Sequence, residues 1–164
     1  MVYGLTKGQA SPTSEYGFAT KTQPYGVLSD SLNPLALALS QGVGFVARGY
    51  CSEVKHLSSL IRAAMEYPGF SMIDILQVCV TFNPVNTFQF YKERAYLLDD
   101  ENHPTDNWHA AMDLAMKWGD RIPVGLIYQK ETLPYTKRVK ILEKGPLLNQ
   151  TYDSEGIQET LDGQ

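Results

Sequence analysis

The sequence predicts an α/β protein with a partial parallel sheet and flanking helices. Three consecutive segments support this prediction: an apolar run over residues 44–50, an amphipathic stretch up to Pro68, and a second apolar run over residues 70–79. Short apolar runs bounded by turn residues are typical of buried strands, and the order strand–helix–strand is the βαβ unit of a parallel sheet. Since ligands of such sheets gather beyond the carboxyl ends of the strands, we expect any ligand site there.

Composition is that of an ordinary globular protein. The 164 residues suffice for one domain with its own core, with 43% hydrophobic and 20% charged residues. The 14 basic and 18 acidic residues give a net charge of −4, and the scattered cations argue against a nucleic-acid partner. No apolar run is long enough to span a membrane, and no secretory leader is recognisable. We therefore expect a cytoplasmic protein whose two cysteines are free thiols.

The first half of the chain is predicted element by element from its turn residues. Residues 1–32 are punctuated by proline and glycine and are expected to be irregular. A helix is expected over residues 34–40, because Pro34 suits a first helical turn. The first strand follows, and Ser52 is the predicted cap of the amphipathic helix. Apolar residues recur at helical spacing up to Pro68, after which the second strand follows.

The second half is less regular in its pattern. Residues 83–106 contain several turn signals and are predicted to form an irregular connection with one apolar patch. Thr105 or Asp106 is the predicted cap of a helix over residues 107–118, and a last strand is expected over residues 124–128. Beyond these elements the chain becomes polar.

The opening segment contains the residues most suggestive of a ligand site. Gly4 and Gly8 lie there among hydroxyl side chains and a single lysine, Lys7. Glycines allow a backbone to approach a ligand closely, and exposed amides with hydroxyl groups and a cation suit an anion such as a phosphate. An ordinary surface loop is the alternative on composition alone, because such clusters are common in loops.

The order of residues in this segment, YGLTKGQ followed by SPTS, resembles the β subunit of 2-oxoacid:ferredoxin oxidoreductases. These enzymes use thiamine diphosphate to convert 2-oxo acids oxidatively to acyl-coenzyme A. Further matching motifs follow in family order, namely GFVAR (44–48), HL (56–57), GFS (69–71), ID (73–74), CVTFN (79–83), Arg94 and PVGLIY (123–128). The resemblance covers most of the chain.

The chain also departs from this family. A complete β subunit has, upstream of the matching region, a Cys-x-x-Cys pair, a third cysteine and a Gly-Asp-Gly element that ends in a magnesium-binding asparagine. None of these is present in the sequence. The resemblance therefore implies the C-terminal half of a thiamine diphosphate-binding domain over residues 1–150, followed by a flexible polar tail over residues 151–164.

The resemblance assigns cofactor contacts to the opening turn. The carbonyl oxygen of Val2 would complete the oxygen shell of Mg²⁺, an ion that commonly bridges phosphates. Gly4, Leu5 and Thr6 would lie against the diphosphate of the cofactor. The alternative is a surface turn.

Lys7 and Cys79 are the other candidate site residues. The Lys7 ammonium would attract a substrate carboxylate as a point charge. Because pyruvate-preferring members of the family more often have a small residue at this place, the resemblance favours a dicarboxylic substrate such as 2-oxoglutarate. Cys79 would be one thiolate ligand of a [4Fe-4S] cluster, which needs four. The alternatives are a solvated lysine and a buried core cysteine.

Arg48 and Arg94 could pair with acids at a subunit interface or contact coenzyme A phosphates, and a structural role is favoured for both.

The implied function is that of part of a β subunit in an oxidoreductase of the EC 1.2.7 type. It would catalyse the coenzyme A-dependent oxidative decarboxylation of a 2-oxo acid, with 2-oxoglutarate favoured, and pass electrons to ferredoxin. The implied partners are the α subunit, the N-terminal half of the β subunit and ferredoxin. One alternative is a non-catalytic fragment that acts as a binding or assembly module, and another is an unrelated transferase that depends on Cys79.

Overall fold

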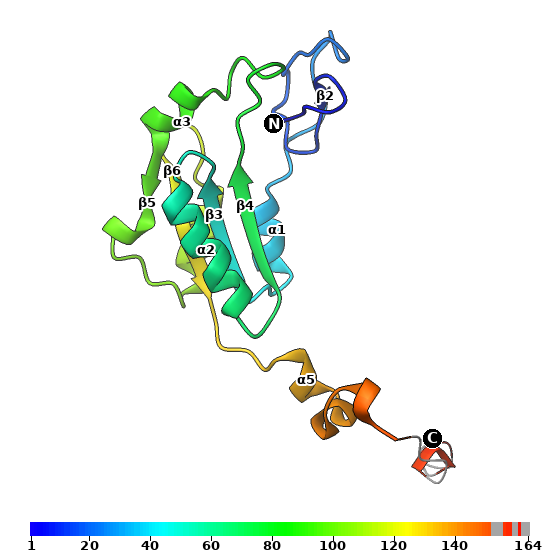
Figure 1. The fold of residues 1–164 in the computed structure, drawn as a ribbon. Helices are drawn as coiled ribbons and strands as arrows, with labels where there is room; N and C mark the ends of the chain where they lie inside the picture. The colour runs from blue at the N-terminus through cyan, green and yellow to red at the C-terminus, as the bar shows by residue number, and fades with distance from the viewer. Residues whose placement is uncertain (152–155, 159–160, 162–164) are drawn as a thin grey trace. The chain divides into compact units, whose positions relative to one another are not determined.

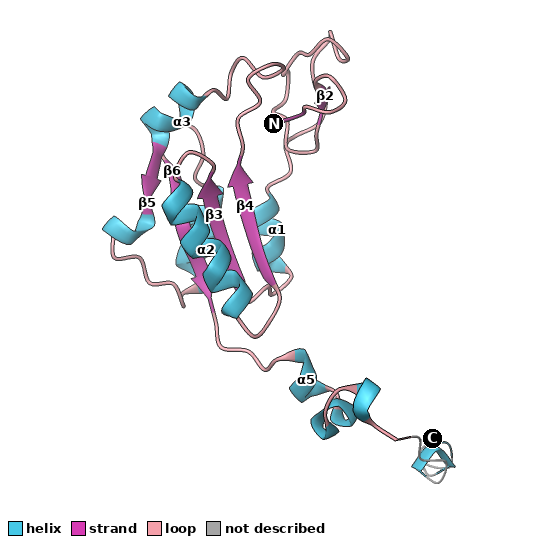
Figure 2. Ribbon diagram, viewed as in Figure 1, coloured by secondary structure: helices cyan, strands magenta, loops and turns pink. Residues whose placement is uncertain are grey.

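The computed structural model describes residues 1–151, 156–158 and 161, and the chain divides into two compact units, Met1–Thr132 and Leu133–Gln164. Figure 1 shows the path of the chain and Figure 2 its helices and strands. The elements of the first unit are β1 (Val2–Tyr3), β2 (Gln9–Ala10), α1 (Pro34–Ser40), β3 (Phe45–Tyr50), α2 (Val54–Glu66), β4 (Ser71–Leu76), α3 (Phe88–Arg94), β5 (Ala95–Leu97), the 3-10 turn η1 (Leu98–Asp100), α4 (Trp108–Met116) and β6 (Ile122–Gln129).

A four-stranded sheet in the order β4-β3-β6-β5 forms the centre of the first unit. The predicted α/β class is confirmed, since β3 and β4 run parallel with α2 between them in the chain. The sheet is mixed, because β6 runs antiparallel to β3 and parallel to β5. An apolar run identifies a buried strand but not its direction, so the sequence pattern could not predict this reversal.

Helices cover both faces of the sheet. Helix α2 packs on β3, β4 and β6, while α1 and α4 pack against each other and on the opposite face (Figure 1). All six residues of β3 are buried, as expected for a central strand covered on both faces. On the face of α1 and α4, the core includes Leu39, Val46 and Ile127, each at most 1% exposed.

The predicted helices α1, α2 and α4 are confirmed, but two of their caps differ from the prediction. Helix α2 begins after Glu53 instead of Ser52, and its cap makes no side-chain hydrogen bond. Helix α4 is capped by Asn107 instead of Thr105 or Asp106, because the Asn107 side-chain oxygen accepts from the amides of His109 and Ala110. Several polar residues in succession can each act as a cap, and the tertiary fit selects one of them.

The prediction of an irregular connection over residues 83–106 is wrong. This region contains α3, β5 and the turn η1, and Thr87 caps α3 by accepting from the amide of Phe90. Tertiary packing accounts for the helix: Tyr91 is completely buried, and its ring lies 5.4 Å from that of Tyr50 on β3. A seven-residue helix held by one buried aromatic residue is too short to show a periodic pattern.

Up to residue 151, the described part of the second unit contains three short helical turns. They are α5 (Tyr135–Arg138), η2 (Lys140–Lys144) and η3 (Leu147–Asn149), and none of them has a buried residue. The predicted flexible tail over residues 151–164 lies mostly outside the described residues. In the part of the chain that the structure describes, no helix has the length and apolar character needed to cross a membrane.

Candidate functional site

The opening segment forms a tight hairpin at the amino terminus. Strands β1 and β2 pair antiparallel, with Val2 opposite Ala10 and Tyr3 opposite Gln9. Two bonds of 3.0 Å close the turn: the amide of Lys7 donates to the Gly4 carbonyl, and the amide of Gly8 donates to the Tyr3 carbonyl. Gly8 has a φ of 94°, which favours glycine, and Lys7 has a φ of 62°. The turn is therefore held by hydrogen bonds and backbone conformations within residues 3–8.

The tip of the hairpin, residues 4–7, is exposed to solvent. The amides of Leu5 and Thr6 donate to no other group among the described residues, and the Lys7 side chain follows them directly. Consecutive free amides beside a cation attract anions. The donors at the tip are chemically suited to an anion, and every residue of the tip is equally compatible with the alternative, a surface turn, so the diphosphate contact stays a prediction.

The hairpin lies against the segment that follows β4. A methyl group built on Gly4 would lie 3.5 Å from the Sγ atom of Cys79, and one built on Gly8 would lie 3.2 Å from Cβ of Phe82. Two predicted site residues, Gly4 and Cys79, are therefore neighbours. Cys79 lies beyond the end of β4 instead of within the strand, because β4 ends at Leu76.

Asn83 fixes the shape of the segment beneath the hairpin. Its side chain is buried, and its backbone amide donates to the carbonyl of Cys79 at 3.1 Å. Its side-chain oxygen accepts from the amides of Val85 and Asn86 at 3.0 and 2.9 Å. Because these bonds close successive turns, they hold the backbone that carries Cys79 in one conformation.

Hydroxyl groups of the opening segment anchor Met1. The Ser11 and Ser14 hydroxyls both donate to the Met1 carbonyl, the former at 2.9 Å, and the Met1 ammonium donates to the Thr13 carbonyl at 3.0 Å. Burial lowers the pKa of this ammonium group, and the charge of Glu15 opposes the shift. Val2, the predicted magnesium ligand, is half-buried in β1 directly after this anchor.

A cavity of 310 Å³ lies at the carboxyl ends of β3 and β4, beside Met1. Arg48 of β3 lines it and is 3% exposed, and its Nε atom donates to the Asp74 carboxylate on β4 at 3.1 Å. Burial lowers the pKa of the guanidinium group, and Asp74 opposes that shift. The guanidinium carbon also lies 5.5 Å from the centre of the Trp118 ring. Arg48 therefore lies at this end of the sheet and pairs with an acid of the same chain, which agrees with the structural role that the sequence favoured.

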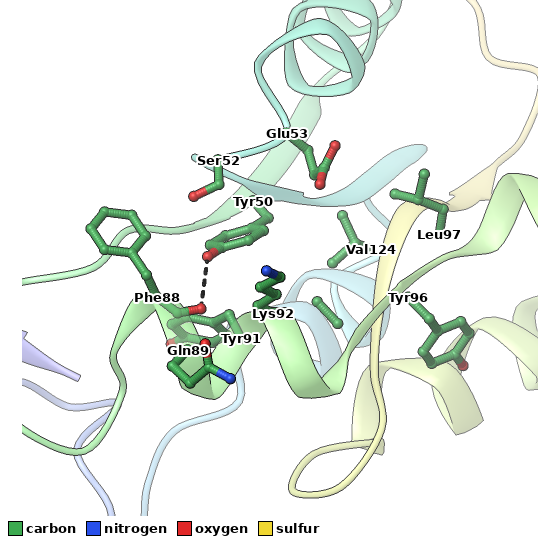
Figure 3. A pocket seen from close by; sticks show the side chains of 11 residues that line it. Tyr50, Ser52, Glu53, Phe88, Gln89, Tyr91, Lys92, Tyr96, Leu97 and Val124 are labelled. Carbon is green, nitrogen blue, oxygen red and sulfur yellow. Dashed lines mark hydrogen bonds between the residues drawn. The ribbon is translucent and has the colours of Figure 1, made fainter.

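A second pocket, of 320 Å³, lies between the end of β3, the start of α2 and α3 (Figure 3). The Tyr50 hydroxyl donates to the Phe88 carbonyl at 3.3 Å across it. Lys92 and Glu53 also line the pocket, so its lining combines one basic and one acidic side chain with several aromatic rings. The sequence interpretation missed this pocket because it treated residues 83–106 as a connection. No periodic pattern could have revealed it, because α3 has only seven residues.

The remaining candidates do not form a separate site. Arg94 bonds within α3, to the Phe90 carbonyl at 3.2 Å and the Glu93 carboxylate at 3.0 Å. Cys51 is half-buried and packs against the core beneath α3. Among the described residues, no group of three or more His, Cys, Asp or Glu side chains could hold a metal ion. A cluster bound at Cys79 would need its other thiolates from elsewhere.

Two family models match the chain. Residues 1–75 match the model described as thiamine pyrophosphate enzyme, C-terminal TPP binding domain. Residues 79–144 match the model of the C-terminal region of the pyruvate ferredoxin oxidoreductase β chain. Together the two matches extend from the hairpin, through the sheet, to the second unit.

The names of three curated relatives agree with these two family descriptions. The chain is 45% identical over 150 residues to the 2-oxoacid:ferredoxin oxidoreductase subunit beta of a Sulfolobus species, which covers 85% of the chain and 49% of the relative. For the subunit beta of Saccharolobus solfataricus the identity is 43%, covering 88% of the chain and 50% of the relative. The 2-oxoglutarate oxidoreductase subunit KorB of Mycobacterium tuberculosis is 44% identical over 94 residues, 57% of the chain and 25% of the relative.

A solved structure is similar over nearly the whole chain. It is the 2-oxoglutarate:ferredoxin oxidoreductase from Magnetococcus marinus with 2-oxoglutarate, coenzyme A and succinyl-CoA bound. The identity is 36% and the TM-score 0.83, over 97% of this chain and 54% of that one. The chain spans about half the length of the curated relatives from Sulfolobus and Saccharolobus.

Proposed function

The chain belongs to the family of 2-oxoacid:ferredoxin oxidoreductase β subunits and corresponds to their C-terminal part, and from this premise we propose that it supplies one half of the site that oxidises a 2-oxo acid. The observation that carries the proposal is the contact between the hairpin and Cys79. A phosphate-binding turn and a thiolate ligand are the two parts that such a site needs from this chain. They are distant in the sequence, yet Gly4 lies against the Cys79 sulfur.

The hairpin would bind the diphosphate of thiamine diphosphate. The free amides of Leu5 and Thr6 would donate to its oxygens, with Gly4 allowing close approach, and the Val2 carbonyl would complete the shell of Mg²⁺. When bound, thiamine diphosphate supplies the carbon chemistry of decarboxylation, and the protein supplies position and electrostatics. The match of residues 1–75 to a thiamine pyrophosphate-binding family supports this assignment.

Lys7 would select the substrate. Its left-handed backbone conformation and exposed side chain leave the ammonium free to meet a carboxylate beside the cofactor. A second substrate carboxylate would gain from this charge, so we propose 2-oxoglutarate in preference to pyruvate. The names of the KorB relatives and of the Magnetococcus structure support this choice.

Cys79 would provide one thiolate of a [4Fe-4S] cluster close to the cofactor. The carboxylate carbon of the substrate would leave as carbon dioxide, and the acyl group would pass to the coenzyme A sulfur with loss of the thiol proton to solvent. The two electrons released would pass one at a time to ferredoxin, and a cluster held by Cys79 would supply the one-electron path. The N-terminal half of the β subunit would supply the other thiolates, and an α subunit would complete the complex. A non-catalytic binding or assembly role is the second candidate, favoured by the lack of a three-ligand metal group among the described residues.

The proposal is tested by co-expressing this chain with the N-terminal half of the Sulfolobus β subunit and its α subunit. We expect a brown complex that reduces a viologen dye when given 2-oxoglutarate, coenzyme A, thiamine diphosphate and Mg²⁺. Lys7→Leu should lower the rate with 2-oxoglutarate more than the rate with pyruvate, and Lys21→Leu, an exposed lysine of the same segment, should change neither. A complex that assembles but remains colourless and inactive would favour the non-catalytic role.

A further inference from the structure

We propose that the pocket between the end of β3, the start of α2 and α3 binds a free aromatic α-amino acid. In this site Lys92 meets the carboxylate of the ligand, Glu53 meets its ammonium group, and its ring packs against Tyr50. The inference goes beyond the proposed function and does not rest on it, because the lining of the pocket includes neither a residue of the hairpin nor Cys79.

The first observation is the size of the pocket and the aromatic character of its floor. The volume of 320 Å³ lies near the lower end of the range for small-molecule sites, about 300–1,000 Å³, and therefore suits a ligand with a single ring. We call its most deeply buried lining residues, Tyr50, Tyr91 and Val124, the floor, and each is at most 5% exposed. Aromatic rings gain from contact with another ring beyond the area that they bury, so this floor favours an aromatic ligand.

The second observation is a pair of opposite charges on two walls of the pocket. Lys92 belongs to α3, whereas Glu53 directly precedes α2 (Figure 3). Among the described residues that line the pocket, these two are the only charged ones. Neither side chain forms an ion pair or a hydrogen bond with the other or with any other described residue. A ligand that carries both charges would satisfy both groups and leave no net charge in the pocket.

Helix α3 presents Lys92 to the pocket and engages its own other polar groups. Phe88 and Lys92 are four residues apart and therefore lie on one face of the helix, which lines the pocket. The Gln89 side chain donates to the Glu93 carboxylate at 2.6 Å, and Glu93 also pairs with Arg94 at 3.0 Å. Lys92 thus remains the available cation of this wall, and its flexible stem lets the ammonium follow a ligand carboxylate.

The two charges and the floor together select the class of ligand. An aromatic carboxylate would pair with Lys92 but bring a second anion near Glu53, and an aromatic amine would bring a second cation near Lys92. A nucleotide carries more negative charge than one lysine beside a carboxylate can balance. An aliphatic amino acid would satisfy both charges but make no ring contact with the floor. An aromatic α-amino acid matches all three features.

Isothermal titration calorimetry of the full chain with L-phenylalanine tests the inference. We expect saturable binding at one site with a Kd of about 1 mM or lower, as for a small ligand held by two charged contacts and one ring. Three analogues each lack one feature: 3-phenylpropionate the ammonium group, 2-phenylethylamine the carboxylate and L-alanine the ring. Each should bind roughly tenfold more weakly than L-phenylalanine. No saturation by L-phenylalanine at about ten times the expected Kd would overturn the inference, as would equal binding of L-alanine.

Two substitutions assign each charge to its partner. Lys92→Met should weaken L-phenylalanine and 3-phenylpropionate roughly tenfold without weakening 2-phenylethylamine. Glu53→Gln should weaken L-phenylalanine and 2-phenylethylamine roughly tenfold without weakening 3-phenylpropionate. Lys117→Met and Glu66→Gln remove exposed charges outside the pocket and should bind every ligand like the wild type. A loss of structure would weaken all three ligands alike, so equal weakening of both analogues by either pocket variant would refute the assignment.

The same titration of the assembled complex separates a free ligand from a protein occupant. Retained binding supports a free amino acid, whereas binding to the chain alone but not to the complex would identify a neighbouring subunit as the occupant and overturn the inference. L-phenylalanine binding requires neither thiamine diphosphate nor iron. Its failure would therefore leave the proposed function intact, and a colourless, inactive complex would leave the amino-acid site intact.

Discussion

Replacing Gly8 by alanine should loosen the hairpin that carries the proposed diphosphate site. Gly8 has a φ of 94°, and a methyl group there would lie 3.2 Å from Cβ of Phe82. The left-handed region costs a residue with a Cβ roughly 1–2 kcal/mol, and the contact adds a displacement of Phe82 by a few tenths of an ångström. We therefore expect the free energy needed to open the hairpin to fall by at least the same roughly 1–2 kcal/mol.

Hydrogen exchange measures this opening directly. The amides of Lys7 and Gly8 close the turn, so they report whether the hairpin is formed. A cost of about 1–2 kcal/mol corresponds to roughly 5- to 30-fold faster exchange of a peptide covering residues 1–10. The affinity of the assembled complex for thiamine diphosphate should fall in parallel, because the free amides of Leu5 and Thr6 would no longer be held together.

Gly17→Ala provides a matched control. Gly17 has a φ of 77°, but a methyl group there would meet nothing within 4 Å. This variant therefore carries similar backbone strain in the same segment without touching Phe82. Unchanged exchange over residues 1–10 in Gly8→Ala, or equal acceleration there by Gly17→Ala, would refute the argument that Gly8 fixes the hairpin against the segment of Cys79.

Three further predictions concern the fold. Asn107→Ala should lower the free energy of unfolding by about 0.5–2 kcal/mol through loss of the α4 cap, whereas Ser52→Ala should change it by less than about 0.5 kcal/mol in urea titrations. Leu39→Ala, which opens a cavity at a side chain 1% exposed, should cost about 2–5 kcal/mol, and Leu37→Ala, at 48% exposure, far less. Burial raises the pKa of the Tyr91 phenol above its usual 10.0, so its stabilising contribution is complete below pH 10 and is lost as pH rises further. Thermal melts at increasing alkaline pH should therefore show a smaller loss of stability for Tyr91→Phe than for the wild type.

The sequence predicted those elements whose apolar pattern extends over several turns or a whole buried strand. The periodic apolar positions of α2 and the apolar residues on both sides of Arg48 in β3 identified both elements to within a few residues. Helix α3 was missed because it has only seven residues and is stabilised by burial of Tyr91, a tertiary effect. The direction of β6 was missed because an apolar run has no direction.

In the candidate site, too, some features could be predicted from the sequence and others depend on the fold. Motif order placed Gly4 and Cys79 among the site residues, but only the fold brings the Cys79 sulfur against the hairpin. Nη1 of Arg48 has no hydrogen-bond partner among the described residues, and this has no local signature, since it depends on which side chains surround the end of β3. The family resemblance therefore proposed the roles of individual residues, and long-range packing determined which of them meet.

The iron content of the assembled complex tests the central claim most directly, namely that the hairpin and Cys79 belong to one redox site. Cys79→Ser should abolish the visible absorbance of the cluster and its bound iron, whereas Cys51→Ser, at the other free thiol, should retain both. A Cys79→Ser complex that retains the full iron content of the wild type would contradict the account.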